Sequence, residues 1–258
     1  MPSPGSSELR LGPFSGHWYG LLVALGGVLF CVVTALIAER RDGRGYDVFW
    51  LCLAALPGAL IGARVYHLVT GGSGSPGEQA LDVGGGGLGI FGAALGGALV
   101  LAVGARLRGL DWLRVLDYAT PGLALAQAIG RVGNWFNQEL YGEPTNRPWG
   151  LAIDLEHRPP GLLSHTHFQP TFAFEGVWDL ALALVVAWLL LRRRPARRGV
   201  ALGAWLAGYG AGRFWIEGLR IEPTHHLGPL RLNQVVALGM ALAGVTLIGW
   251  AGRTRGTT

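Results

Sequence analysis

Long apolar stretches separated by short polar segments run along almost all of this 258-residue chain. A helix that crosses a bilayer needs about 20 mostly apolar residues, and seven stretches reach that length. They cover approximately residues 18–38, 48–69, 86–105, 115–137, 171–191, 200–219 and 233–252. The pattern therefore predicts an all-α integral membrane protein with seven transmembrane helices.

The composition agrees with this prediction. Hydrophobic residues make up 50% of the chain and charged residues only 14%, whereas soluble proteins carry about 25% charged residues. These values exclude a disordered chain, a disulfide scaffold and an ordinary cytosolic enzyme. Cys31 and Cys52 both lie inside apolar stretches, where we expect them to be buried hydrophobic side chains.

The arginines predict the orientation of the helices. The chain has no lysine, and most of its 21 basic residues follow the first, third and fifth apolar stretches or lie in the C-terminal tail: Arg40, Arg41, Arg44, Arg106, Arg108, Arg114, Arg192, Arg193, Arg194, Arg197, Arg198, Arg253 and Arg255. The opposite side has only Arg10, Arg147, Arg158, Arg220 and Arg231. Because cytoplasmic loops are enriched in arginine, we expect the N-terminus outside and the C-terminus in the cytoplasm. The run at 192–198 is then a topology signal, and we expect no nucleic-acid partner.

The longest segment on the outer side covers residues 138–170 and is rich in proline. We expect it to form a small extracytoplasmic head or lid within a single membrane domain of residues 1–258. His165 and His167 in this segment lack a third ligand at usable spacing, so we expect no metal site.

A glycine-rich motif, Gly87-x-Gly89-x-x-Gly92, has the letters of the dinucleotide fingerprint. That fingerprint requires a preceding strand and a βαβ unit. Here it lies in an apolar stretch that also contains Gly92-x-x-x-Gly96, a pattern typical of close helix packing in lipid. We therefore expect close packing here and no nucleotide site.

Arginines inside the apolar stretches are the strongest chemical signal. Arg64, Arg131 and Arg213 occupy such positions, where each charge costs about 2.5–3.5 kcal/mol to insert and is usually paired or functional. Tyr209, Arg213 and Glu217 are spaced by four residues, which places them on one helix face. Arg220 follows near the outer boundary.

A second polar stripe combines Arg131 with Asn134 and Asn137, at spacings of three residues. Amides in lipid need hydrogen-bond partners, so the two stripes predict a polar cavity near the outer leaflet. Guanidiniums bind phosphate through paired hydrogen bonds, which favours an anionic lipid or another phosphate-bearing ligand. Glu175 and Asp179 share one face of the fifth helix and could pair with an arginine. The alternative is that these charges only hold the bundle together.

Residues 130–142 (GRVGNWFNQELYG) closely resemble the signature of the phosphatidylglycerol–prolipoprotein diacylglyceryl transferase family. Four further blocks are similar to the family in order. They are 17–21 (HWYGL), 62–64 (GAR), 170–175 (PTFAFE, against the family's HPTQLYE) and 209–220 (YGAGRFWIEGLR). The resemblance covers about residues 16–240.

The resemblance implies an enzyme of the bacterial cytoplasmic membrane with seven helices. Members move diacylglyceryl from phosphatidylglycerol to the lipobox cysteine thiol of a prolipoprotein and release glycerol 1-phosphate, with no metal or nucleotide cofactor. We expect a monomer whose partners are phosphatidylglycerol, prolipoprotein lipobox segments and membrane lipid.

The resemblance also suggests roles for individual residues. The substrate thiolate must attack the glycerol carbon that carries the phosphate. Arg131 and Arg213 would bind the phosphate and stabilise the departing charge, while Asn134 and Tyr19 would position the headgroup or glyceryl. Glu139, Glu217 and His17 are alternative proton acceptors, and the two glutamates could instead orient an arginine. The expected lipid-binding set also includes Asn137, Gly142, Arg64, Tyr209 and Arg220.

The chain departs from the family at three positions. Phe91 stands where the glycine-rich block often has histidine, and Gln169 and Phe174 replace the histidine and tyrosine of HPTQLYE. These changes remove the most obvious imidazole base and motivate one alternative, a non-catalytic lipid-binding paralogue. A second alternative is a transporter of a lipid or phosphate compound, which would require an inverted repeat that the sequence does not show.

Overall fold

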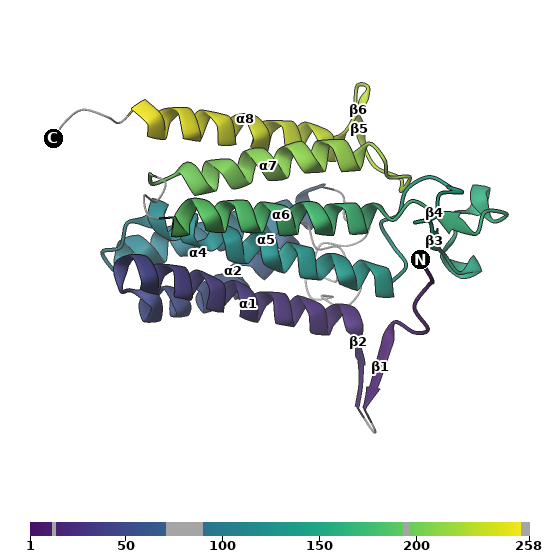
Figure 1. Ribbon diagram of the computed structural model, residues 1–258, viewed down its shortest axis with the longest axis horizontal. Coiled ribbons are helices and arrows are strands. Elements are labelled where there is room, and N and C mark those ends of the chain that lie inside the picture. Colours follow the sequence, from purple (N-terminus) through teal and green to yellow (C-terminus); the bar gives the residue numbers. More distant parts are fainter. Residues whose placement is uncertain (12–13, 71–89, 193–196, 254–258) are drawn as a thin grey trace. The chain divides into compact units, whose positions relative to one another are not determined.

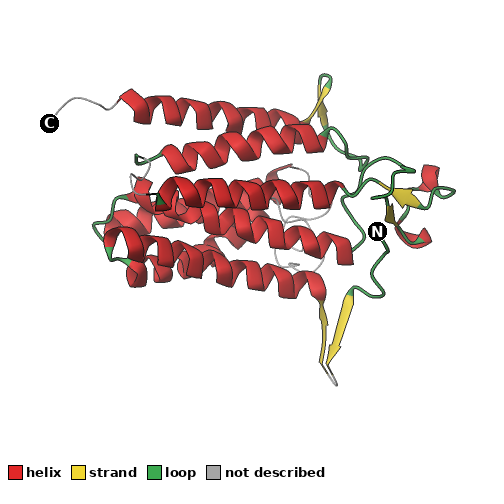
Figure 2. Ribbon diagram, viewed as in Figure 1, coloured by secondary structure: helices red, strands yellow, loops and turns green. Residues whose placement is uncertain are grey.

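A computed structural model describes residues 1–11, 14–70, 90–192 and 197–253 of the chain (Figure 1). Within these ranges there are seven α-helices: α1 (Trp18–Asp42), α2 (Gly45–Thr70), α4 (Ile90–Leu107), α5 (Trp112–Phe136), α6 (Thr171–Leu191), α7 (Val200–Glu217) and α8 (Leu232–Arg253). Short antiparallel pairs join β1 (Glu8–Leu11) to β2 (Phe14–His17), β3 (Leu151–Ala152) to β4 (His167–Phe168), and β5 (His226–Leu227) to β6 (Leu230–Arg231) (Figure 2).

Each of the seven apolar stretches overlaps one of these helices, which confirms the prediction of an all-α membrane protein in its coarse form. Four described helices are long and apolar enough to cross a bilayer: Trp18–Asp42, Gly45–Tyr66, Thr171–Leu191 and Leu232–Arg253. The described apolar part of α4, Gly92–Leu107, is shorter. Two further helices, α5 and α7, carry the polar stripes.

The chain divides into two compact units, and each is described by itself. Cys31–Ala119 forms one unit, in which α2 packs against α4 through glycines. A Cβ added at Gly62 would overlap the carbonyl oxygen of Gly92, and one added at Gly96 would overlap that of Gly58. The close packing expected from Gly92-x-x-x-Gly96 is therefore confirmed, whereas Gly87 and Gly89 lie outside the described residues. Cys31 and Cys52 are free and buried.

Met1–Phe30 and Thr120–Thr258 form the other unit. In this unit α6 packs against α7, and α7 against α8, side by side (Figure 1). Glycines again permit the close approach, since a Cβ at Gly203 would lie 2.8 Å from the carbonyl oxygen of Gly244. A Cβ at Gly210 would lie 2.5 Å from that of Ala237. This packing fixes α7 between its two neighbours.

The segment between α5 and α6 folds around a small core. Its buried members are Tyr141, Leu151, Ile153, Phe168 and Phe172, and burial raises the pKa of the Tyr141 phenol. Two short 3₁₀ helices, Leu155–His157 and Pro160–Leu162, complete the segment. The amino-terminal residues attach to it, because the Ala152 amide donates to the Met1 carbonyl at 2.9 Å.

Candidate functional site

A buried carboxylate, Glu175 of α6, accepts hydrogen bonds from three guanidiniums. It is 1% exposed and accepts hydrogen bonds from Nη2 of Arg131 at 2.6 Å and from Nη1 of Arg213 at 3.2 Å. Nη2 of Arg220 donates to its other oxygen. The three arginines come from α5, from α7 and from the segment after α7, so this carboxylate joins three parts of the chain.

A second carboxylate, Glu217 at the end of α7, continues the network. It forms an ion pair with Arg213 at 2.8 Å and accepts from Nε of Arg231 at 3.0 Å and from the Asn233 amide at 3.2 Å. The Arg213–Glu217 pair confirms the face predicted from their spacing. Arg231 also donates to the backbone carbonyls of Arg220 (2.5 Å) and Glu222 (2.7 Å), which anchors the segment after α7.

The polar stripe of α5 connects to the same cluster. Nη1 of Arg131 donates to the Asn134 side-chain oxygen at 3.3 Å. The Asn134 amide donates to Glu139 at 2.8 Å, and the Asn137 amide donates to the same glutamate oxygen at 3.0 Å. Asn134 therefore links Glu139 to Arg131, and the Asn amides find the partners that the sequence required.

The turn that carries Glu139 has an unusual backbone. Gln138 and Leu140 adopt left-handed φ values of 49° and 56°, a conformation that costs about 1–3 kcal/mol at a strained site. Gln138 is held by a reciprocal pair of hydrogen bonds with Asp154, at 2.6 and 2.8 Å, and its amide donor lowers the pKa of that aspartate. The Leu140 carbonyl accepts from the Thr171 hydroxyl at 2.7 Å. These contacts fix the backbone on both sides of Glu139.

Gly142 allows neighbouring backbone segments to approach its own backbone closely. Its amide donates to the Gln169 carbonyl at 2.8 Å, and its backbone forms an isolated β-bridge with Arg220. A Cβ at this position would lie 2.5 Å from the Leu219 carbonyl oxygen and 2.9 Å from the Thr171 methyl group. The absence of a side chain at Gly142 therefore sets the position of the segment that carries Arg220.

The cluster has positive charge and hydrogen-bond donors in excess. Among the described residues, its ion pairs join four arginines (Arg131, Arg213, Arg220 and Arg231) to two glutamates. The Nε–H groups of Arg131, Arg213 and Arg220 are buried and have no acceptor in that part of the chain. Burial, followed by repulsion from Arg213, lowers the pKa of Arg220 to about 10, so this group stays charged at neutral pH. Such a cluster suits an anion with several oxygens.

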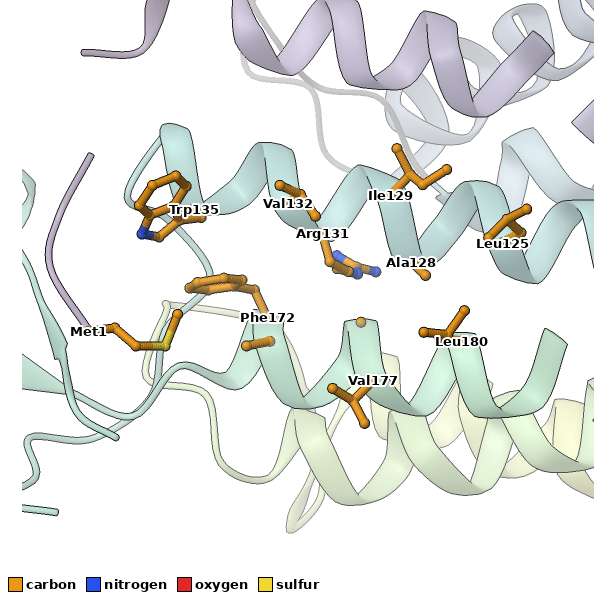
Figure 3. Close-up of a pocket in the computed structure, with 12 residues that line it drawn as sticks. Met1, Leu125, Ala128, Ile129, Arg131, Val132, Trp135, Phe172, Val177 and Leu180 are labelled. Atoms are coloured by element: carbon orange, nitrogen blue, oxygen red, sulfur yellow. The ribbon is translucent and has the colours of Figure 1, made fainter. Parts of the chain in front are cut away.

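An apolar groove of about 530 Å³ lies between α5 and α6, with Arg131 in its wall (Figure 3). Its lining includes Ile129 and Val132 of α5 and Val177 and Leu180 of α6. A buried guanidinium cluster and an apolar surface therefore adjoin each other on the same helix pair. This arrangement is typical of a site for a lipid with an anionic headgroup.

The other predicted residues occupy different places. The Tyr19 ring packs over Gly133, where a Cβ would lie 2.6 Å from Tyr19 Cδ2. Tyr209 is buried on the Arg213 face of α7 and stacks on Trp205 with ring centroids 5.5 Å apart. His17 is exposed at the end of β2. Arg64 is buried in α2, which belongs to the other unit.

The comparison with known proteins decides the family. A family description, "Prolipoprotein diacylglyceryl transferase", matches residues 7–250. The chain belongs to this family. A phosphatidylglycerol–prolipoprotein diacylglyceryl transferase of Cutibacterium acnes is 40% identical over 253 residues, covering 96% of this chain and 85% of that protein. A relative with the same name in Synechococcus elongatus is 38% identical, and the match covers 96% of this chain and 88% of that protein. The relative named transferase 1 in Streptomyces coelicolor is 39% identical, and the match covers 99% of this chain and 75% of that protein.

Two of the three departures from the family can be placed. Gln169 contributes backbone groups, since its carbonyl accepts from Gly142 and its amide donates to the Glu143 carbonyl at 3.0 Å. Phe174 is half-buried in the first turns of α6. The Phe91 side chain lies outside the described part of the structure. No group of three or more His, Cys, Asp or Glu side chains gathers as a metal site among the described residues.

Sequence reasoning missed two members of the cluster as site residues. Glu175 was expected only as a partner for some arginine, and its contact with three of them depends on how three helices pack. Arg231 was assigned to the outer side with no role. Arg231 is the last residue of β6, directly before α8, and the turn at Gly228 (φ 62°) between β5 and β6 brings the chain back toward Glu217.

Proposed function

We propose that this protein transfers the diacylglyceryl group of phosphatidylglycerol to the lipobox cysteine thiol of prolipoproteins and releases glycerol 1-phosphate. Family membership supports this reaction. The observation that carries it is the cluster around Glu175, where three buried guanidinium Nε–H groups have no acceptor among the described residues, next to an apolar groove. Together they fit a phosphodiester headgroup with its acyl chains.

In the proposed reaction the cysteine sulfur attacks the carbon of the diacylglyceryl group that is esterified to the phosphate. A carbon–sulfur bond forms, the carbon–oxygen bond breaks, and glycerol 1-phosphate leaves with the bonding electron pair. Arg131 and Arg213 bind the phosphate and stabilise this charge, with Arg220, Asn134 and Asn137 completing the headgroup site.

The thiol must lose its proton before or during the attack. Glu217 is engaged by two guanidiniums and one amide, and we assign it a positioning role. Glu139 faces two amide donors that both bind one of its oxygens, so we propose it as the proton acceptor. Tyr19 and Tyr209 would orient the glyceryl group. The exposed position of His17 makes it the weaker candidate base.

The proposed topology has all seven helices crossing the cytoplasmic membrane, the N-terminus outside and the C-terminus in the cytoplasm. Residues 138–170 form an extracytoplasmic head of a single domain, and the enzyme acts as a monomer. Arg64 is proposed as a further lipid-binding residue. The folded core of the 138–170 segment supports its assignment as a head.

The test is transfer from phosphatidylglycerol to a lipobox peptide by the purified protein. Arg131→Ala should lower the rate about 100-fold or more, the range for loss of a charge-stabilising donor. The matched control is Arg147→Ala, because Arg147 is exposed and stacks over Trp149. Undiminished transfer by Arg131→Ala would overturn the headgroup role.

Complementation of cells depleted of their own transferase separates the alternatives. Restored lipidation of lipoproteins is expected from the wild-type chain and not from Arg131→Ala. A wild-type chain that is expressed in the membrane but restores no lipidation would favour a transporter or a non-catalytic lipid-binding paralogue.

A further inference from the structure

Glu175 stands at the point toward which three phosphate-binding arginines converge. We propose that Glu175 is the resting counter-ion of the phosphate site, which yields guanidinium donors to the lipid phosphate and limits how tightly the product is held. This inference rests on the proposed function, because it assigns the phosphate of the substrate to the same arginines. It makes Glu175 a positioning residue that acts through them.

The contacts of Glu175 resemble those that a phosphate would make. One carboxylate oxygen accepts from Arg131 and Arg213, and the other accepts from Arg213 and Arg220. Two oxygens that share three guanidiniums imitate two non-ester oxygens of a phosphodiester. A phosphate at these arginines must therefore compete with Glu175 for the donors that the carboxylate now holds.

Burial makes this competition strong. Glu175 is 1% exposed and Arg213 and Arg220 are each 7% exposed, and charges interact more strongly where water is excluded. The three unpaired Nε–H groups provide additional donors for phosphate oxygens. The phosphate can thus bind while Glu175 keeps part of its hydrogen bonds.

The charge of the network explains why a carboxylate is needed. Four arginines face two glutamates in its ion pairs, an excess of two positive charges within those pairs. Glu139, joined to Arg131 through Asn134, adds one negative charge. The phosphodiester of the lipid carries one negative charge, and a phosphomonoester product carries about 1.5 to 2. A bound product therefore offsets the positive excess of the network as long as Glu175 carries its negative charge. Without that charge it would keep about one positive charge more and retain the product.

Glu175→Gln tests the proposal because it keeps the shape and removes the charge. Relative to wild type, the inhibition constant of glycerol 1-phosphate and the KM for phosphatidylglycerol should each fall about tenfold or more. The reason is that the substitution removes a buried negative charge that repels the phosphate and competes for its arginines. The kcat should fall because product release slows. Glu175→Asp keeps the charge and should return the inhibition constant toward the wild-type value. Unchanged or weaker product inhibition in Glu175→Gln would overturn the proposal.

Asp179→Asn is the matched control. Asp179 lies one turn along α6 and is fully buried, and neither of its carboxylate oxygens has a hydrogen-bond partner among the described residues. If product inhibition depends on the carboxylate that contacts the arginines, Asp179→Asn should change the inhibition constant clearly less than Glu175→Gln does. An equal effect of both substitutions would show that only total charge matters, which contradicts a specific counter-ion.

Binding of inorganic phosphate to the purified full chain provides a readout that does not require transfer. Phosphate should change the carboxylate bands of the infrared difference spectrum of the wild type and of Asp179→Asn, and this change should shift in Glu175→Asp. These spectra test the counter-ion role even if Glu175→Gln fails to fold. If the wild type binds phosphate with no change in its carboxylate bands, Glu175 does not yield guanidinium donors to phosphate and the proposal is refuted. A wild type that shows the band change but no transferase activity would refute the proposed function and leave the counter-ion role intact.

Discussion

Gly142→Ala should reduce transfer without unfolding the protein. The added Cβ would lie 2.5 Å from the Leu219 carbonyl oxygen and 2.9 Å from the Thr171 methyl group. An ordinary contact needs at least 3.4 Å, so the backbone at Leu219 must retreat by roughly 1 Å. The next residue, Arg220, bridges to Gly142 and donates to Glu175. A displacement of this size at a catalytic group costs about 100-fold in rate.

The assay is lipobox-peptide transfer, measured with the thermal unfolding temperature of the same preparation. Gly161→Ala is the matched control in the same segment, because a Cβ there meets nothing within 4 Å. We expect Gly142→Ala to lose about two orders of magnitude in kcat/KM and Gly161→Ala to match the wild type. The spacing argument is refuted if Gly142→Ala, correctly folded, transfers at the wild-type rate.

Two further substitutions test separate features: Gly96→Ala tests the packing of α2 against α4, and Arg231→Ala tests the anchoring of the arginine cluster. Gly96→Ala would overlap the Gly58 carbonyl and should destabilise the protein by about 1–3 kcal/mol in thermal unfolding. Gly97→Ala makes an ordinary contact at 3.5 Å and should be neutral, so equal stability of the two variants would contradict the packing. Arg231→Ala removes the hydrogen bonds to Glu217 and to the Arg220 carbonyl and should lower kcat about tenfold or more, since a buried ion pair is broken. A wild-type kcat in that variant would show that Arg220 needs no such anchor.

The helices could be predicted from the sequence because lipid imposes a length and a composition on each span. Each of the seven predicted ranges overlaps one helix, and α6 occupies the predicted residues 171–191. The three strand pairs were not predicted. Their strands have two or four residues, too few for a period-two pattern to stand out from neighbouring polar sequence.

The contacts within single helices of the site could also be predicted from the sequence. Helical spacing predicted that Arg213 and Glu217 share a face, and the structure joins them in an ion pair. Spacing also grouped Arg131 with Asn134, whose side chains are hydrogen-bonded. The link from Arg131 through Glu175 to Arg220 crosses 44 and 45 residues of sequence. Such contacts depend on the packing of separate helices, which periodicity does not specify.

The cost of buried charge connects the fold to the chemistry. Each arginine inside the apolar stretches is expensive to insert alone, and Glu175 and Glu217 offset this cost by pairing with several guanidiniums at once. Complete neutralisation would stabilise the empty protein further, but it would leave no donor and no net charge for an anionic headgroup. In the ion pairs, two carboxylates join four arginines. They hold the helices together, but they are too few to provide an acceptor for every guanidinium N–H group. The same deficit of negative charge therefore makes the free protein less stable and, in the function we propose, favours a phosphate-bearing lipid.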